Sequence, residues 1–404
     1  MSATIKKKVF FPNLNGVRFV AAMMVVVHHV EQIKINFGYP SVYRDNIYGT
    51  NLGGLGVTLF FVLSGFLITF LLLEEKKEFG SISLKDFYIR RILRIWPLYY
   101  LVVFLSFFII PTFFSNIIIS DFKTMLNVDY YKKLAMYMFF TPNIAFITMY
   151  PVLFVSQAWS VGVEEQFYAI WPLLVKQFRR PLHIMISIIV VYICINMTLE
   201  NLVWKTGGMM SQFFVYKNFF LVTRIDCMAV GGMFAFLALN KNRLFIVFQS
   251  KIFQLLVYAT TIILAYYEIP FKGLGHLPYA ILFGVIIFNL ALNHDTILKL
   301  NHSVFEYGGK ISYGIYMFHS LGIILIFLAY KKIDIHLNVI GTNFALYGAS
   351  IILTLLLSSL SYQFYEKYFL LKKNKFSSII SGDNVQEQSD ISKSGISIKS
   401  QSLT

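Results

Sequence analysis

The sequence predicts an all-α integral membrane protein with about ten transmembrane helices and both termini in the cytoplasm. Of its 404 residues, 57% are hydrophobic and only 14% are charged, whereas soluble domains carry about a quarter charged residues. Apolar stretches long enough to span a bilayer recur up to residue 360 and are separated by short polar loops. The net charge of +15 is explained mainly by Lys and Arg in cytoplasmic loops.

The first three spans follow from this pattern. Lysines at positions 6–8 precede the first span, about residues 10–32, which we expect to act as an uncleaved signal anchor. The second span, about 54–73, leads into a basic segment that belongs in the cytoplasm after two crossings. The third span covers about 95–116.

The region 131–158 decides the topology of everything that follows it. If it crossed the membrane, the basic residues at 176, 179 and 180 would lie outside and the later basic loops would be inverted. Pro142 and Pro151 interrupt the region, which suits irregular backbone buried in protein. We therefore predict that 131–158 is re-entrant or lies in the membrane interface.

The remaining spans complete one membrane domain, residues 1–371, and a polar tail, 372–404, is predicted to be disordered and cytoplasmic. These spans cover about 164–176, 183–200, 219–239, 252–269, 276–293, 310–330 and 340–361.

Arg18 and His29 form the most informative pair of residues. They lie eleven residues apart in one apolar run, so on a helix both side chains point from one face, about 16 Å apart along the axis. Ionisable side chains in a membrane helix usually face a bundle interior or a water-filled cavity. The pair therefore indicates a functional site.

A cluster of three arginines, Arg90, Arg91 and Arg94, precedes the third span. Arginine forks bind phosphate oxygens well, so the cluster is a candidate site for a phosphorylated cofactor. An ordinary basic flank of a membrane helix is the alternative interpretation.

Two adjacent carboxylates, Glu164 and Glu165, begin another apolar stretch, and Tyr168 shares a helical face with Glu164. A helix N-terminus at the interface would stabilise one carboxylate. Both carboxylates together with Tyr168 are more typical of a polar cluster that faces a cavity.

Three more ionisable residues occur inside predicted spans. Arg224 and Asp226 fit a structural ion pair and a site equally well. A lone histidine such as His319 is often a packing element, but with His29 present it becomes a candidate active-site residue. The two cysteines give neither a disulfide framework nor a metal-site spacing, and no metal is expected.

In order and spacing, these motifs resemble the acyltransferase-3 family of integral membrane acyltransferases over about residues 10–370. The matching segments are Asn13 to Arg18 with His29, residues 56–68, residues 90–97, residues 159–168 and Ser312 to His319. Asn15 stands where the family usually has Asp, which leaves open whether a charge is needed beside Arg18. Some members carry an additional hydrolase-like extracytoplasmic domain, and we expect this chain to be of the stand-alone type.

The resemblance implies an enzyme of the bacterial inner membrane that moves an acyl group, usually acetyl from acetyl-CoA, to a hydroxyl of a cell-surface glycan or glycan precursor. O-antigen and exopolysaccharide are among the possible acceptors. The expected partners are acyl-CoA, a glycan or lipid-linked sugar and membrane lipids, with no nucleic acid. A transporter or flippase of lipid-linked sugars is the alternative, although no internal repeat is visible.

The resemblance and the residue chemistry together assign roles to these positions. We expect His29 to act as the general base on the acceptor hydroxyl or to carry a covalent acyl group. The other candidate catalytic residues are Arg18, Glu165 and His319. The candidate cofactor-binding residues are Arg90, Arg91 and Arg94, and the candidate substrate-binding residues are Glu164, Tyr168, Arg224 and Asp226.

Overall fold

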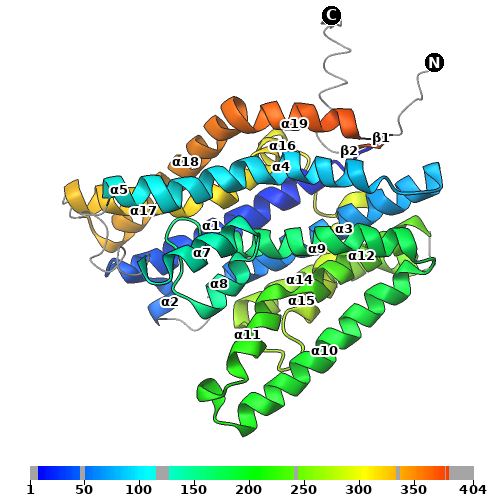
Figure 1. Ribbon diagram of the computed structural model, residues 1–404, viewed down its shortest axis with the longest axis horizontal. Helices are drawn as coiled ribbons and strands as arrows, with labels where there is room; N and C mark the ends of the chain where they lie inside the picture. The colour runs from blue at the N-terminus through cyan, green and yellow to red at the C-terminus, as the bar shows by residue number, and fades with distance from the viewer. Residues whose placement is uncertain are drawn as a thin grey trace, which may run out of the picture.

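The computed structural model describes residues 8–45, 51–114, 127–240, 244–333, 337–377 and 379–381. Within these ranges the fold is helical apart from two strands of two residues each, so the predicted all-α class is confirmed (Figure 1). The polar tail beyond residue 381 and the lysines at positions 6 and 7 lie outside the described residues.

The helices are α1 (Leu14–Asn36), α2 (Val42–Asp45), α3 (Leu52–Phe79), α4 (Leu84–Phe104), α5 (Ile110–Phe114), α7 (Tyr130–Met138), α8 (Pro142–Thr148), α9 (Ala158–Gln177), α10 (Pro181–Lys205), α11 (Phe214–Thr223), α12 (Ile225–Leu239), α13 (Leu244–Gln249), α14 (Lys251–Tyr267), α15 (Leu277–Leu292), α16 (Ser303–Lys310), α17 (Ser312–Ile333), α18 (Val339–Ser361) and α19 (Lys367–Lys373). The strands β1 (Lys8–Val9) and β2 (Ile380–Ser381) pair in parallel.

Seven helices in the described part of the chain are long and apolar enough to cross a membrane. Three of the predicted spans are not among them. Helices α14 and α15 have only 17 and 16 residues, and the 20-residue α9 contains two glutamates, two glutamines and a lysine. The total of ten spans therefore stays a prediction.

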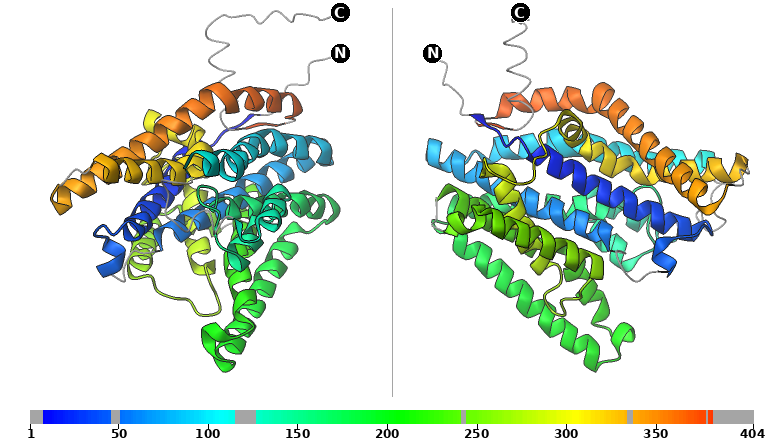
Figure 2. Two further views of the ribbon diagram at one scale, coloured as in Figure 1. Left: turned by 60° about the vertical axis from the view of Figure 1, so that its left-hand side comes forward. Right: turned by 180° about the vertical axis from the view of Figure 1, so that it is seen from behind.

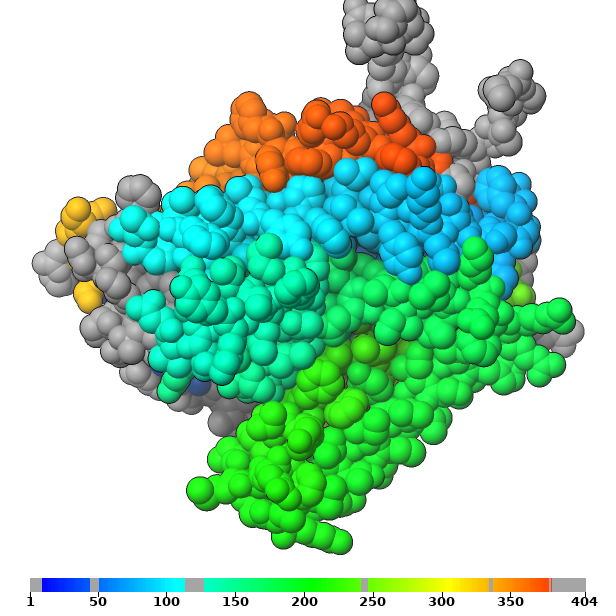
Figure 3. Space-filling model, in the orientation of Figure 1, coloured from blue at the N-terminus to red at the C-terminus, as the bar shows by residue number. Residues whose placement is uncertain are grey.

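The region 131–158 contains no helix long enough to span a bilayer. It forms the short helices α7 and α8, of 9 and 7 residues, joined by a sharp turn in which Phe140 has a φ of +56°. The hydroxyl groups of Tyr99 and Tyr100 on α4 donate hydrogen bonds to the carbonyls of Tyr137 and Met138. These contacts hold the segment against α4 (Figure 3), and its re-entrant or interfacial position stays a prediction.

Glycines allow three central helices, α1, α3 and α12, to pack closely. A Cβ atom on Gly65 of α3 would lie 2.0 Å from the carbonyl oxygen of Met228, and one on Gly231 of α12 would lie 2.0 Å from that of Val62. A Cβ atom on Gly56 would lie 2.8 Å from a backbone oxygen of α1. Small residues permit this backbone approach in membrane bundles.

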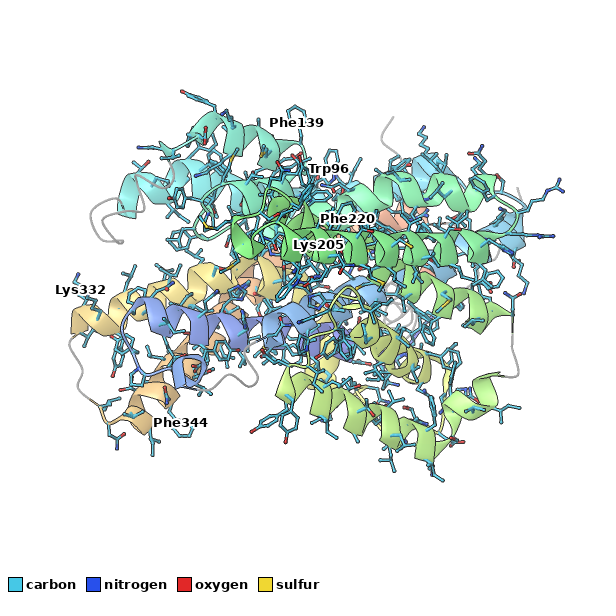
Figure 4. All side chains as sticks on the ribbon, turned by 90° about the horizontal axis from the view of Figure 1, so that it is seen from below. Trp96, Phe139, Lys205, Phe220, Lys332 and Phe344 are labelled. Atoms are coloured by element: carbon cyan, nitrogen blue, oxygen red, sulfur yellow. The ribbon has the colours of Figure 1, made fainter. Side chains whose placement is uncertain are left out.

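The bundle has two distinct ends. At one, the strand end, β1 and β2 lie beside the turn from α3 to α4 (Figures 1 and 2). The Lys76 ammonium there donates a hydrogen bond to the carbonyl of Val175, near the end of α9. The far end contains the C-terminus of α1, the N-terminus of α3 and Lys332 of α17 (Figure 4).

We predict that Gly65→Ala destabilises the protein by about 1–3 kcal/mol, because the added methyl group meets backbone rather than a flexible side chain. Thermal unfolding of the purified protein in detergent measures this change. Gly348→Ala on α18 is the matched control, since a Cβ atom there meets nothing within 4 Å. Equal melting temperatures for the two variants would contradict the close contact between α3 and α12.

Candidate functional site

An elongated cavity of about 190 Å³ runs through the bundle from the strand end. Phe60 and Glu75, both on α3, lie along its wall, and fifteen helical residues correspond to about 22 Å. At the strand end it is lined by the arginines of α4 and by residues that follow α19, and at its inner end by Ser160 and Tyr316. The cavity is thus long and basic at one end, and between its ends α3 contributes both apolar side chains, such as Leu67 and Leu71, and the polar Ser64.

The three arginines of α4 all line the cavity, but their contacts differ. Arg90 donates hydrogen bonds to the Phe376 carbonyl (2.6 Å) and to Glu75 (3.4 Å). The Arg91 guanidinium lies over the rings of Phe87 and Tyr168, at 5.5 and 5.6 Å from their centroids. Its buried Nε atom has no hydrogen-bond partner among the described residues. An anion in the cavity would satisfy this costly buried donor.

Glu164 faces the cavity and holds two of its neighbours. Its carboxylate accepts hydrogen bonds from the Ser64 hydroxyl (3.0 Å) and from the Tyr168 hydroxyl (2.9 Å). Ser64 was not assigned a role from sequence, and the structure places it as a donor that fixes this carboxylate. Glu164 and Tyr168, both predicted substrate-binding residues, are therefore brought together.

Glu165, by contrast, is not among the residues that line the cavity. The Trp96 indole N–H donates a hydrogen bond of 2.8 Å to one of its oxygens, and the other oxygen has no partner among the described residues. The next residue, Gln166, donates to the Phe140 carbonyl and to Asn143. Consecutive residues of α9 thus serve the contact with α4 and the turn between α7 and α8 (Trp96 is labelled in Figure 4).

Arg18 lines the cavity from α1. Its guanidinium donates a hydrogen bond of 2.7 Å to the side-chain oxygen of Asn15. A neutral amide therefore supplies this contact where the family usually has a carboxylate. Asn13 anchors the start of α1, since its amide donates to the Leu290 carbonyl and accepts from the Leu300 N–H.

His29 and His319 form a contacting pair, with their ring centroids 4.7 Å apart and their planes tilted by 55°. In each ring Nδ1 lies near a backbone carbonyl oxygen, that of Val25 for His29 (2.8 Å) and that of Tyr316 for His319 (2.7 Å). Because a carbonyl only accepts hydrogen bonds, Nδ1 carries the proton and Nε2 keeps a lone pair in the neutral ring. Both histidines thus present Nε2 as a potential base.

The histidine pair lies just beyond the inner end of the cavity, and Tyr316 connects the two. The Tyr316 ring lines the cavity, and its centroid is 5.8 Å from that of His319. Its hydroxyl donates a hydrogen bond to the Gln157 carbonyl and is 2.6 Å from the Ser160 hydroxyl. Ser320 donates to the Gln157 side chain and is 3.3 Å from His319 Nε2.

Sequence reasoning assigned no site role to Gln157, Ser160, Tyr316 or Ser320. Ser160 and Tyr316 fall within the matching motifs, and Ser320 is adjacent to His319. Gln157 and Ser160 form hydrogen bonds with Tyr316 and Ser320, about 160 residues away in the sequence. No local sequence pattern reveals contacts between such distant positions.

Arg224 and Asp226 are not among the cavity-lining residues. Arg224 breaks the predicted span 219–239 into α11 and α12, with a φ of +43°. Its guanidinium donates hydrogen bonds to the Gly54 carbonyl (2.8 Å), Thr58 (3.0 Å) and the Leu221 carbonyl (2.9 Å). Arg224 thus ties α12 to the start of α3 at the far end, and Asp226 lies in the first turn of α12.

The model of the acyltransferase domain family, acyltransferase-3, matches residues 11–363. The chain belongs to this family. Together with its several apolar helices, membership of this family makes the chain a multi-pass membrane protein. No solved structure matches the chain.

Curated relatives are similar to the chain at low identity. YrhL of Bacillus subtilis, provisionally named a peptidoglycan O-acetyltransferase, is 26% identical over 381 residues, which is 89% of this chain and 54% of YrhL. OatA of Listeria monocytogenes, named a peptidoglycan O-acetyltransferase, is 25% identical over 323 residues, 77% of this chain and 49% of OatA. A provisionally named O-acetyltransferase of Staphylococcus aureus (strain COL) is 25% identical over 90% of this chain and 58% of its own length. The chain spans about half the length of these relatives.

We predict that Arg224→Met destabilises the protein by about 2–3 kcal/mol, because the variant keeps the aliphatic stem but leaves three acceptors without their donor. Thermal unfolding in detergent measures the effect, with the exposed Arg180→Met as the control. An unchanged melting temperature would show that the contacts of Arg224 are not structural and would favour its predicted role in substrate binding.

Proposed function

We propose that this chain is an O-acetyltransferase of the bacterial inner membrane that moves an acetyl group from acetyl-CoA to a hydroxyl of a cell-envelope glycan. The observation that carries the proposal is the elongated cavity, which has an arginine cluster at one end and a contacting histidine pair just beyond the other. The names of the relatives favour a peptidoglycan acceptor over O-antigen or exopolysaccharide. Membership of an acyltransferase family favours the enzyme over the transporter.

The cavity fits an acyl-CoA donor in charge and shape. Acetyl-CoA supplies an acyl group as a thioester at the end of a long arm whose other end carries phosphates. Arg91 and Arg94 provide guanidinium groups for phosphate at the strand end, and the unpartnered Nε of Arg91 supports this assignment. Between the ends, the apolar side chains of α3, such as Leu67 and Leu71, suit the alkyl parts of the arm, and the polar Ser64 suits its amides. In this arrangement the strand end is the cytoplasmic end of the bundle.

Arg18 belongs to the donor site in this proposal rather than to the reacting centre. It lines the cavity, whereas His29 lies about 16 Å further along α1. That distance is too great for Arg18 to stabilise charge that develops beside His29. Arg18 could either hold the donor or stabilise negative charge that develops during the reaction. Only the first role fits this distance.

His29 takes the proton of the acceptor hydroxyl. Its Nδ1–H is held by the Val25 carbonyl, which aims the basic Nε2 and fixes the tautomer. His319 packs against the ring and restricts its rotation. The same Nε2 lone pair would attack the acyl carbon in the covalent route, so both routes depend on this atom.

We predict that His29→Ala lowers the rate of acetyl transfer by at least about a hundredfold, the usual contribution of a general base, while donor binding is kept. Protein in nanodiscs with radiolabelled acetyl-CoA and a glycan acceptor measures both quantities. His183→Ala, at an exposed position, is the control. Transfer at the wild-type rate by His29→Ala would exclude either role for His29.

We predict that the double variant Arg91→Gln/Arg94→Gln binds CoA at least tenfold more weakly, because it loses two charge-assisted contacts with phosphate. Equilibrium binding of radiolabelled CoA measures this loss, and the exposed Arg179→Gln is the control. If the wild type neither binds CoA nor turns over acetyl-CoA, the proposed donor is wrong, and transport of lipid-linked sugars becomes the function to assay.

A further inference from the structure

The last residue of α19 and the segment that follows this helix lie across the strand end of the bundle and form part of the cavity wall. Lys373, Ser377 and Ile379 all line the cavity, although they lie about 280 residues from the arginine cluster in sequence. We call residues 373–377 and 379–381 the C-terminal strap. Its last two residues form β2, which pairs with β1 at the other end of the chain.

The strap is a packed part of the structure. Ser377 and Ile379 are buried, at 6% and 7% exposure. Arg90 donates a short hydrogen bond of 2.6 Å to the Phe376 carbonyl and also contacts Glu75, a buried carboxylate. Two of the Arg90 donors therefore go to protein acceptors, unlike the buried Nε of Arg91. Arg90 fixes the strap beside the cavity.

The strap adds a cation and a hydroxyl donor at the outer end of the cavity. Lys373 brings an ammonium group to the end that already contains Arg91 and Arg94. Glu75, an acid in the same wall, is engaged by Arg90. A donor whose thioester points toward the histidine pair must leave its nucleotide at this outer end.

We propose that the C-terminal strap is part of the donor site, where Lys373 and Ser377 bind the ribose phosphate at the nucleotide end of acyl-CoA. This inference rests on the proposed acyl-CoA donor. It assigns Arg90 as a positioning residue that acts through the strap, and it leaves the inner phosphates to Arg91 and Arg94. The ammonium and hydroxyl groups are suitable donors for the phosphate oxygens.

The test compares the binding of CoA and of dephospho-CoA, which lacks the ribose phosphate, to the full chain in nanodiscs. We expect Lys373→Ala to weaken CoA binding about fivefold and to leave dephospho-CoA binding unchanged. Lys372→Ala is the matched control, because the adjacent Lys372 does not line the cavity and its ammonium lies 4.1 Å from the Tyr368 ring centroid. It should bind both ligands as the wild type does.

Each outcome separates this inference from the proposed function. The role of the strap would be overturned if Lys373→Ala bound CoA as tightly as the wild type, or if it bound CoA and dephospho-CoA equally more weakly. Neither result would contradict the proposed acyl-CoA donor. Absence of CoA binding by the wild type would overturn the donor itself, and with it this inference.

The role of Arg90 has its own readout. If Arg90 acts through the strap, Arg90→Gln should reduce the preference for CoA over dephospho-CoA, and the double variant with Lys373→Ala should lose no more than the stronger single variant. Additive losses would instead mean that Arg90 binds phosphate directly.

Discussion

The structure depends on one constraint, the high cost of burying ionisable groups in a membrane bundle without partners. Glu31 near the end of α1 shows how the constraint is met. Its carboxylate accepts hydrogen bonds from Lys34, Ser41, the backbone N–H of Val42 and Tyr347. These contacts fix the connection after α1 and join α1 to α18. A group with so complete a set of partners has no capacity left for a ligand, so its role is structural.

The hydrogen bonds of the buried ionisable groups also distinguish the scaffold from the candidate site. Arg224 donates hydrogen bonds to two backbone carbonyls and a threonine hydroxyl, whereas Arg91 has a buried Nε without a partner among the described residues. His29 and His319 use Nδ1 for backbone carbonyls and keep Nε2 as an acceptor. Arg91 Nε at the cavity and His29 Nε2 just beyond it are thus groups whose remaining hydrogen bonds a ligand can supply.

Much of this organisation could be predicted from the sequence, because hydropathy and helical spacing are local properties. They gave the all-α class, the interrupted segment at 131–158 and the position of Arg18 in a cavity wall. Spacing does not reveal the direction of an individual side chain, so the sequence could not show that Glu164 lines the cavity and that Glu165 instead binds Trp96. The break at Arg224 was missed because the hydropathy of the region is that of one continuous span. The C-terminal strap was missed because a polar tail carries no signal for the distant surface on which it packs.

Tyr316 shows how the two halves of the site can be joined without an open passage. Its ring lines the cavity while its carbonyl holds His319, and its hydroxyl is engaged by Gln157 and Ser160. A continuous water-filled channel would let ions cross the membrane, whereas an aromatic side chain at this position keeps the basic cavity apart from the histidine pair. In the proposed reaction only the acetyl end of acetyl-CoA would have to pass Tyr316, and that end is small and uncharged. The charged phosphates would stay with the arginines, so the proposed transfer is compatible with a sealed membrane.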